Sequence, residues 1–321
     1  MKETTHRFVE TNGIRMHIAE SGKGPLIILC HGFPELSYSW RHQIGVLGEA
    51  GFHCVAPDQR GYGQTEQPGP IGSYHILNLV GDIVGLVKAL GEKEAVIVGH
   101  DWGASIAWHC ALLRPDLFSA VVALSVPFLP RLEGSLPPTE VMKKMSGEQV
   151  FYQLYFQEPG RAEADLEADV RKTMRRTLYS LSGDSPPERR WRFMLDKSEK
   201  TLHPSSTLEA LPAWLKEEDV DYFTEEFQRT GFRGGLNWYR NIDRNWELTS
   251  FLDGAKIRLP ALFVAGEVDP VVTMYRKAYD TLQRNVLHLK GKTLIPGVGH
   301  WVNQERPDEV NQLILEFLKS L

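Results

Sequence analysis

The stretch that decides the fold is VIVGHDWGAS, residues 96–105. It begins with an apolar, β-branched run typical of a buried strand, and it ends in small residues that open a helix. Between them, GHDWG (residues 99–103) has the form G-x-nucleophile-x-G of a sharp strand-to-helix turn. The usual residue in the middle of this turn is serine, whereas here it is Asp101. Any reaction proposed for this chain must therefore account for a carboxylate in the middle of this turn.

Further apolar runs recur on both sides of this stretch, each bounded by Gly, Pro or Asp. Such continuous runs are typical of strands that helices cover on both faces, as in a parallel sheet. Residues 76–90 and 105–113 have helical periodicity between them, which predicts βαβ units and a doubly wound sheet. The runs are residues 26–30, 53–56, 95–98, 120–124 and 261–265.

The rhythm of strands and helices is interrupted in the middle of the chain. Residues 128–244 are rich in charge and helical in period, with no convincing core strand. We therefore predict a helical lid at 128–244, inserted into a core formed by residues 1–127 and 245–321. At the two ends, residues 8–20 predict a hairpin that turns at Asn12-Gly13, and residues 310–318 fit an amphipathic helix that packs on the sheet.

Composition excludes several classes of function. The 321 residues carry a formal net charge of −5, so no strong basic field favours nucleic acid or an anionic membrane. No apolar run approaches the roughly 18 residues that span a bilayer, and the N-terminal segment lacks the apolar core of a signal peptide. The three cysteines lie in apolar surroundings and fit buried thiols, which favours a cytoplasmic protein.

The chemistry of a carboxylate nucleophile narrows the reaction. The N-terminus of the following helix favours an ionised Asp101, although a simple helix N-cap would explain the residue equally well. Attack on an acyl carbon would give an anhydride, whereas attack on a saturated carbon gives an ester that water can cleave. Epoxides and alkyl halides are the substrates that fit. A serine esterase does not fit, because the sequence contains no G-x-S-x-G.

Partners for Asp101 occur in the order nucleophile, acid, histidine that this architecture requires. Asp269 follows a strong strand in VAGEVDPVV, with Glu267 as its competitor, and His300 lies near the C-terminus in PGVGHW. In ILCHGFPE, the backbone N–H of Phe33 is expected near the turn, and that of Trp102 is expected to complete an oxyanion hole.

HGFPE, GHDWGA, VAGEVD and GVGHW together resemble the aspartate-nucleophile branch of the α/β-hydrolase superfamily. Within the inserted block, LYFQEPG and GFRGGLNWYRN resemble the lid of the soluble epoxide hydrolases, and the resemblance covers nearly the whole chain. It implies the α/β-hydrolase fold, with a mostly parallel eight-stranded sheet, helices on both faces and an inserted helical lid. It also implies hydrolysis of epoxides to vicinal diols through an ester on Asp101.

The resemblance assigns Tyr152 and Tyr239 as the lid tyrosines that hold the epoxide oxygen. The chemistry agrees, because a phenol with a pKa of about 10 stays neutral at pH 7 and can donate a proton to the developing alkoxide. Tyr155, three residues beyond Tyr152, is expected to pack in the lid. Only the resemblance decides which of these two faces the site.

The resemblance also supplies the remaining expectations. The substrate is expected to contact His31, Gly32, Pro34 and Trp301. No cofactor and no metal are expected, because the histidines have no suitably placed set of ligand partners. The expected partner is a small-molecule epoxide, with no nucleic acid and no membrane, and the protein is expected to be a monomer or a homodimer.

Two alternatives remain open from the sequence. A haloalkane or fluoroacetate dehalogenase shares the fold and the nucleophile, and Trp102 suits its halide as well as it suits an epoxide hydrolase; the paired tyrosines favour the epoxide. A non-catalytic ligand receptor on this fold would usually have lost one member of the triad, whereas Asp101, Asp269 and His300 are all present.

Overall fold

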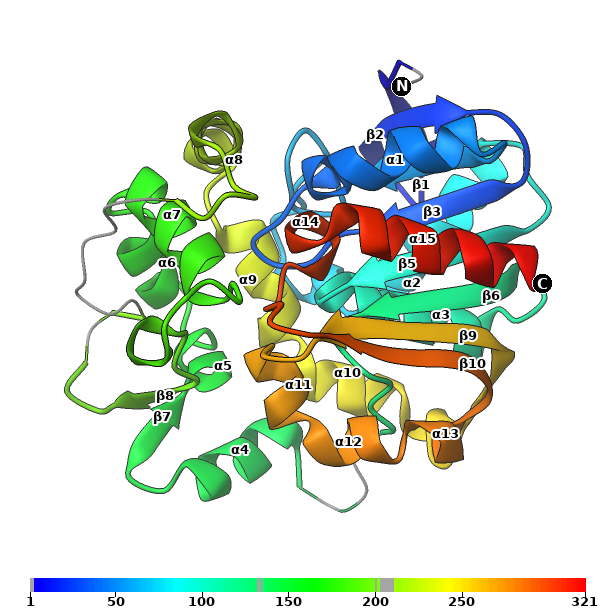
Figure 1. Cartoon of the computed structure of the whole chain (residues 1–321). Helices are drawn as coiled ribbons and strands as arrows, with labels where there is room; N and C mark the ends of the chain where they lie inside the picture. The colour runs from blue at the N-terminus through cyan, green and yellow to red at the C-terminus, as the bar shows by residue number, and fades with distance from the viewer. Residues whose placement is uncertain (1–2, 132–133, 135, 200, 203–210) are drawn as a thin grey trace.

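A single eight-stranded sheet runs through the larger part of the molecule, in the order β1-β2-β4-β3-β5-β6-β9-β10 (Figure 1). The computed structural model describes residues 3–131, 134, 136–199, 201–202 and 211–321. The strands are β1 (Thr5–Thr11), β2 (Ile14–Gly22), β3 (Leu26–Cys30), β4 (His53–Pro57), β5 (Ala95–His100), β6 (Phe118–Leu124), β9 (Ile257–Gly266) and β10 (Val286–Ile295).

The pairing of the strands confirms a mostly parallel sheet. β1 pairs with β2, and β2 with β4, in antiparallel fashion, while every other neighbouring pair is parallel. The predicted hairpin joins β1 and β2, and its two turn residues, Asn12 and Gly13, have φ angles of 45° and 75°. Asn and Gly tolerate this left-handed conformation, which matches the twist of the flanking strands.

Helices cover both faces of the sheet, as predicted. The side chains of β3 show the alternation: Ile27 and Leu29 face one apolar layer, and Ile28 and Cys30 face the other. The first layer is closed by α1 (Arg41–Glu49) and α15 (Pro307–Lys319), and the second by α2 (Ile76–Ala89) and α3 (Trp102–Leu113). The shorter core helices are α11 (Pro270–Met274), α12 (Arg276–Asp280), α13 (Leu282–Asn285) and α14 (Val302–Glu305).

The edge strand β10 was not predicted from the apolar runs. Its sequence, VLHLKGKTLI, alternates apolar and polar residues, and most of its side chains are at least partly exposed. An edge strand has a neighbour on one side only, so it needs no continuous apolar run, and its lysines also discourage pairing with another chain.

The segment between β6 and β9 is mainly helical and lies beside the carboxyl ends of the parallel strands (Figure 1). We propose the division predicted above, with residues 128–244 as the lid. A small pair of strands, β7 (Gln149–Phe151) and β8 (Met194–Asp196), stands apart from the main sheet. The helices are α4 (Pro138–Ser146), α5 (Tyr152–Tyr155), α6 (Arg161–Leu166), α7 (Val170–Ser180), α8 (Glu217–Thr230), α9 (Arg233–Arg240) and α10 (Ile242–Leu248).

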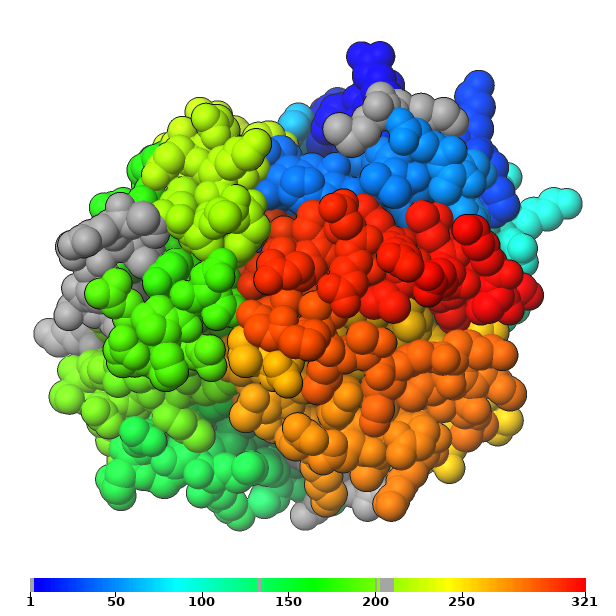
Figure 2. All heavy atoms as spheres, in the orientation of Figure 1, coloured from blue at the N-terminus to red at the C-terminus, as the bar shows by residue number. Residues whose placement is uncertain are grey.

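Lid and core share one apolar cluster. Buried lid residues such as Phe156, Met174 and Phe223 belong to the same cluster as Ile97 and Phe263 of the sheet. In the space-filling view, the green residues of the lid meet the orange and red C-terminal residues without an intervening gap (Figure 2). None of the helices in the described part of the chain has the length and apolar character needed to cross a membrane.

Candidate active site

Asp101 stands on the sharp turn between β5 and α3, as predicted. Its φ of 52° and ψ of −119° lie outside the ordinary regions for a residue with a side chain, and Asp is among the residues that tolerate positive φ best. The turn needs both flanking glycines. A Cβ on Gly99 would meet the carbonyl oxygen of Gly103 at 2.0 Å, and a Cβ on Gly103 would meet that of Cys30 at 2.0 Å.

The loop after β3 closes over the carboxylate of Asp101. The backbone N–H of Phe33 donates to Oδ1 of Asp101 at 2.9 Å. Gly32 makes this approach possible, since a Cβ there would lie 2.4 Å from the same oxygen. Trp102 is the first residue of α3, so its N–H belongs to the helix turn that has no carbonyl partner of its own. The N–H of Phe33 thus binds the carboxylate, and the N–H of Trp102 belongs to the next residue in the chain.

Asp269 and His300 meet beside Asp101. Asp269 follows β9 and caps α11 by accepting the N–H of Val271 at 2.8 Å, while its oxygens lie 3.1 and 3.2 Å from Nδ1 of His300. Asp269 therefore caps α11 and bonds His300 at the same time. The competitor Glu267 is exposed and accepts instead from the N–H of Gly297 at 3.3 Å.

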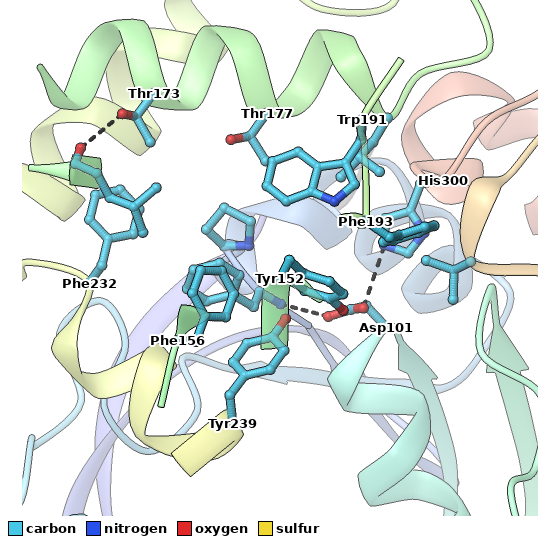
Figure 3. Close-up of a pocket in the computed structure, with 15 residues that line it drawn as sticks. Asp101, Tyr152, Phe156, Thr173, Thr177, Trp191, Phe193, Phe232, Tyr239 and His300 are labelled. Atoms are coloured by element: carbon cyan, nitrogen blue, oxygen red, sulfur yellow. Dashed lines mark hydrogen bonds and ion pairs between the residues drawn. The ribbon is translucent and has the colours of Figure 1, made fainter. Parts of the chain in front are cut away.

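The other ring nitrogen of His300 faces the nucleophile. Its Nε2 lies 3.6 Å from Oδ2 of Asp101 (Figure 3). Burial opposes a charged imidazole, but the charges and hydrogen bonds of Asp269 and Asp101 prevail and raise the pKa of His300 well above its ordinary value. Burial also works against ionised Asp101, yet His300, His100 and the N–H of Phe33 hold the pKa of Asp101 below its ordinary value.

Tyr152 and Tyr239 lie together over Asp101. Their ring centroids are 6.0 Å apart, and Figure 3 shows both rings turned toward the carboxylate. Tyr239, on α9, is held edge-on between Phe33 and Trp102, with centroid distances of 5.4 and 5.1 Å. Burial raises the pKa of both phenols well above 10, so they carry their protons at neutral pH. Tyr155 is buried in the lid with its hydroxyl 3.4 Å from Asp165.

Two cavities meet at this cluster. One, of about 40 Å³, extends under the lid, and the other, of about 220 Å³, extends toward α3 and α11. Both are lined by Asp101, Tyr152, Tyr239 and Val271. The lid-side cavity has a largely apolar wall that includes Pro34, Phe156, Trp191 and Phe193 (Figure 3). The carboxylate of Asp101 therefore borders a cavity on each of two sides.

Two of the predicted substrate-contacting residues lie behind the cavity wall. His31 is fully buried, and its Nε2 accepts the N–H of Gln59 at 3.0 Å. Trp301 is fully buried, and its indole donates to the carbonyl oxygen of Leu178 at 2.7 Å. Neither residue lines the two cavities described above, and their contact with substrate stays a prediction. Pro34 lines the lid-side cavity, and Gly32 contributes close backbone approach.

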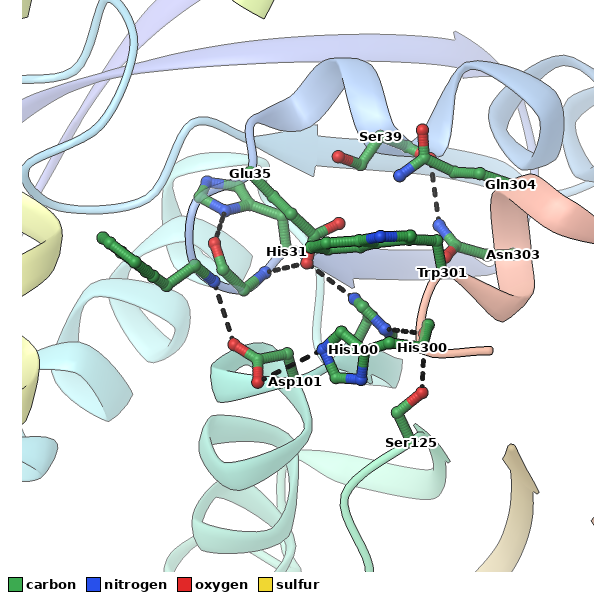
Figure 4. A network of polar contacts seen from close by, with 12 residues as sticks. His31, Glu35, Ser39, His100, Asp101, Ser125, His300, Trp301, Asn303 and Gln304 are labelled. Carbon is green, nitrogen blue, oxygen red and sulfur yellow. Dashed lines mark hydrogen bonds and ion pairs between the residues drawn. The ribbon is translucent and has the colours of Figure 1, made fainter. Parts of the chain in front are cut away.

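The structure adds two residues that the sequence analysis did not single out. Glu35, in HGFPE, is fully buried with Oε1 at 2.6 Å from Nδ1 of His100, whose Nε2 donates to the carbonyl oxygen of His300 at 2.8 Å (Figure 4). Gln153 donates to the hydroxyl of Tyr152 at 2.9 Å. Glu35 bonds a residue that lies far along the chain, which no local pattern shows, whereas Gln153 stands directly next to its partner Tyr152 in the sequence.

No group of three His, Cys, Asp or Glu side chains within the described ranges is arranged to hold a metal ion. The site brings together a carboxylate bonded to the N–H of Phe33, an imidazole aligned by a buried acid, and two neutral phenols. These are the parts of an α/β-hydrolase whose nucleophile is aspartate.

Comparison with known proteins agrees with this class and narrows it. A model of the alpha/beta hydrolase fold family matches residues 25–307. Epoxide hydrolase A of Mycobacterium tuberculosis is 47% identical over 100% of this chain and 99% of its own length. Epoxide hydrolase 1 of Siraitia grosvenorii is 41% identical over the whole of both chains. The chain therefore belongs to the epoxide hydrolase family of the α/β-hydrolase fold.

Solved structures give the same result. An epoxide hydrolase from an endophytic Streptomyces superposes with a TM-score of 0.94 at 44% identity, covering 99% of this chain and 96% of that one. Epoxide hydrolase A from Mycobacterium thermoresistibile superposes with a TM-score of 0.91 at 46% identity, covering 99% and 98%. Likeness of this degree extends over lid and core together.

Proposed function

We propose that this protein hydrolyses epoxides to vicinal diols in two steps, through an ester on Asp101. The observation that carries the proposal is the placement of the Asp101 carboxylate opposite two neutral phenols, Tyr152 and Tyr239, on the wall of one apolar cavity. An epoxide needs attack at carbon from one side and proton donation to oxygen from the other.

In the first step, Oδ2 of Asp101 attacks a ring carbon while Oδ1 stays bound to the N–H of Phe33. The bond between that carbon and the epoxide oxygen breaks, and the electron pair goes to the oxygen. Tyr152 and Tyr239 bind this oxygen and one of them supplies its proton. The product of the step is a hydroxyalkyl ester of Asp101 beside a base that has not yet acted.

In the second step, His300 removes a proton from water, which attacks the ester carbonyl carbon of Asp101. Asp269 accepts a hydrogen bond from Nδ1 of His300 and so leaves Nε2 unprotonated and facing the ester. The negative charge of the tetrahedral intermediate develops on Oδ1, where the N–H groups of Phe33 and Trp102 stabilise it. The bond between the carbonyl carbon and the diol oxygen then breaks, and that oxygen takes the proton of the new carboxyl group, so that the diol leaves and Asp101 is again a carboxylate. The proton held by His300 returns to the phenolate, which restores both the base and the acid.

The phenols distinguish this proposal from dehalogenation. A departing halide needs fixed N–H donors but no proton, so Tyr239 and Tyr152 would have no chemical task in a dehalogenase. A role as a receptor is also less well supported, because nucleophile, acid and base are assembled at distances suited to catalysis.

We also propose that the small-molecule epoxide is the only ligand the enzyme needs, without cofactor, metal, nucleic acid or membrane. The three free, buried thiols suit a reducing compartment, and we propose the cytoplasm. A monomer or a homodimer is proposed for the assembly; size-exclusion chromatography with light scattering distinguishes the two.

The test offers the purified protein styrene oxide or stilbene oxide, with 1-bromobutane and fluoroacetate in parallel, and measures diol and halide. Diol without halide is the expected result. Halide without diol would make the protein a dehalogenase, and the absence of both products would favour the receptor. The Asp101→Ala protein serves as the control for uncatalysed opening of the epoxide.

A further inference from the structure

The C-terminal end of lid helix α7 is bonded directly to the loop that carries His300. The backbone N–H of His300 donates to the carbonyl oxygen of Leu181 at 2.8 Å. One residue later, the indole of Trp301 donates to the carbonyl oxygen of Leu178 at 2.7 Å. The general base is therefore attached to the lid through its own main chain, as well as to the core.

Glycines bring the two backbones into contact. A Cβ on Gly183 would meet the carbonyl oxygen of Gly297 at 2.1 Å, and a Cβ on Gly299 would meet the nitrogen of Gly183 at 2.3 Å. A side chain at either position would force the lid and the His300 loop apart. We call this contact of Gly183 with Gly297 and Gly299 the seam. It lies where the green and the orange-red residues adjoin each other in Figure 2.

A single buried carboxylate, that of Glu305 at the end of α14, lies within this seam. Its Oε2 accepts hydrogen bonds from the N–H of Gly183 at 2.8 Å, the N–H of Gly299 at 3.1 Å and the hydroxyl of Ser182 at 3.1 Å. Its Oε1 accepts the N–H of Trp301 at 3.1 Å. Two of these donors come from the lid, and the other two flank His300 in the sequence.

Among the described residues, these four donors are the ones that bond the carboxylate of Glu305. The residue is 5% exposed, and no lysine, arginine or histidine among the described residues forms an ion pair with its carboxylate. Burial raises the pKa of Glu305, and the N–H groups of Gly183, Gly299 and Trp301 oppose that rise together with the Ser182 hydroxyl. A buried carboxylate is retained only where its hydrogen bonds are filled, so this one is built into its place.

We propose that Glu305 is a positioning residue for the hydrolytic half of the reaction: it ties lid helix α7 to the His300 loop and so holds Nε2 of His300 against the ester on Asp101. This inference rests on the role of His300 proposed above. Glu305 touches neither the cavity nor Asp101, so it acts through His300.

The remaining supports of His300 all come from the core. Its carbonyl oxygen accepts from Nε2 of His100 at 2.8 Å and from the hydroxyl of Ser125 at 2.9 Å (Figure 4). Its Nδ1 bonds Asp269. These contacts keep the loop near its place when Glu305 is removed. The N–H groups before and after His300 would then be buried without their acceptor, and the loop would relax toward other partners.

The two half-reactions separate a positioning role from a merely structural one. Alkylation uses Asp101 and the lid phenols, whereas hydrolysis of the ester uses His300. Loss of Glu305 should slow hydrolysis and leave alkylation unchanged. The ester then accumulates, kcat and KM fall together, and kcat/KM, which is set by binding and alkylation, stays constant.

The experiment measures alkylation and ester decay in single turnovers of Glu305→Ala, with Ile314→Ala as the control for stability alone. Ile314 is buried on α15 in the layer on the opposite side of the sheet from α3, and it lines neither of the two cavities. We expect ester decay at least about tenfold slower in Glu305→Ala, and unchanged in Ile314→Ala at a comparable loss of melting temperature. Equal slowing of both half-reactions, or equal behaviour of the two variants, would overturn the inference.

Two milder variants keep the inference testable if Glu305→Ala does not fold. Ser182→Ala removes one of the four donors, and Glu305→Gln keeps an oxygen for the three donors at Oε2 but turns an NH₂ group toward the N–H of Trp301. Both should slow ester decay less than Glu305→Ala and leave alkylation intact; unchanged decay in both would refute the role of Glu305. His300→Ala is the reference: if it accumulates no ester, the assignment of His300 fails instead.

Discussion

The backbone N–H of Phe33 donates to Oδ1 of Asp101 at 2.9 Å, whereas Oδ2 lies 3.6 Å from Nε2 of His300, so the two oxygens of the nucleophile are not equivalent. Oδ1 already occupies the position where the oxyanion forms, and Oδ2 is free to attack. Hydrolysis at the carbonyl carbon then places the oxygen of water on the enzyme first.

A single turnover in ¹⁸O-labelled water should accordingly label Asp101 and leave the first diol unlabelled. Mass spectrometry of the peptide that contains Asp101 measures the label. Label in the diol of the first turnover would mean that water attacks the epoxide directly.

Asp101→Ala should lower kcat by a factor of roughly 10⁴ or more, since no other group can form the ester.

His300→Ala should separate the two steps. Alkylation needs no base, so the intact mass of the variant should increase by the mass of the epoxide, while turnover falls by about 10²–10⁴. The exposed His288 on β10 supplies the matched control, because His288→Ala removes the same ring far from the site. A His300→Ala protein that turns over normally without an adduct would contradict the two-step scheme.

The phenols should control the first step only. Each single change, Tyr152→Phe or Tyr239→Phe, removes one hydrogen bond to a developing alkoxide, a loss of about 1.5–3 kcal/mol, so alkylation should slow roughly 10–150-fold. The double variant should show no measurable opening of the epoxide. Tyr155→Phe is the control, because its hydroxyl contacts Asp165 within the lid. Normal alkylation by the double variant would require another acid.

Gln153 should assist Tyr152. Its amide donates to the phenol oxygen at 2.9 Å, which leaves the phenol proton directed elsewhere and steadies the phenolate that forms. Gln153→Leu should slow alkylation about fivefold, equivalent to about 1 kcal/mol, without changing ester decay. Gln149→Leu, at an exposed position of β7, supplies the comparison. Slowing of ester decay in Gln153→Leu would contradict this assignment.

The pH dependence should differ between the free enzyme and the ester. Although burial opposes it, the charges of Asp269 and Asp101 raise the pKa of His300, so the free enzyme holds the proton on His300 to a pH above the ordinary range of histidine. Esterification neutralises Asp101 and removes one of these influences. The pKa of His300 therefore falls in the intermediate, and ester decay should rise with pH through the lower value.

Asp101→Asn imitates the neutral state and should lower the pKa of His300, as ¹⁵N NMR of the imidazole measures. The sign for stability follows from linkage: a raised pKa in the folded protein adds stability below the unfolded pKa of histidine, and this contribution is lost as pH rises through the folded pKa. The variant should lose that part of its stability at low pH. An unchanged titration of His300 would show that Asp101 exerts no such influence.

Much of the fold and the central site could be predicted because most strands of the sheet are parallel and buried. In a parallel sheet, residues that follow the strands meet at one edge, so Asp101, Asp269 and His300 could be brought together by their order alone. The apolar runs marked the buried strands for the same reason. The edge strand β10 escaped this rule because only one of its sides has a neighbouring strand.

The rest depended on contacts between distant residues. His31 and Trp301 adjoin site residues in the sequence, yet their own polar atoms bond Gln59 and Leu178 behind the wall. Glu305 accepts hydrogen bonds from residues that lie more than a hundred positions away in the chain, and no local sequence pattern predicts these contacts. The periodicity of a sequence predicts which face of a helix or strand is buried, but it does not predict which residues contact that face.

The contact between Gly183 and Gly299 has a consequence for the passage of substrate and product. If the lid swung away as one body, the N–H of His300 would lose its bond to Leu181, and the catalytic base would lose its support from the lid at each opening. We therefore expect substrate and product to pass through the two cavities that meet at Asp101 while this side of the lid stays closed. The contact between Gly183 and Gly299 is then the fixed part of the lid, and we expect substrate and product to pass on either side of it.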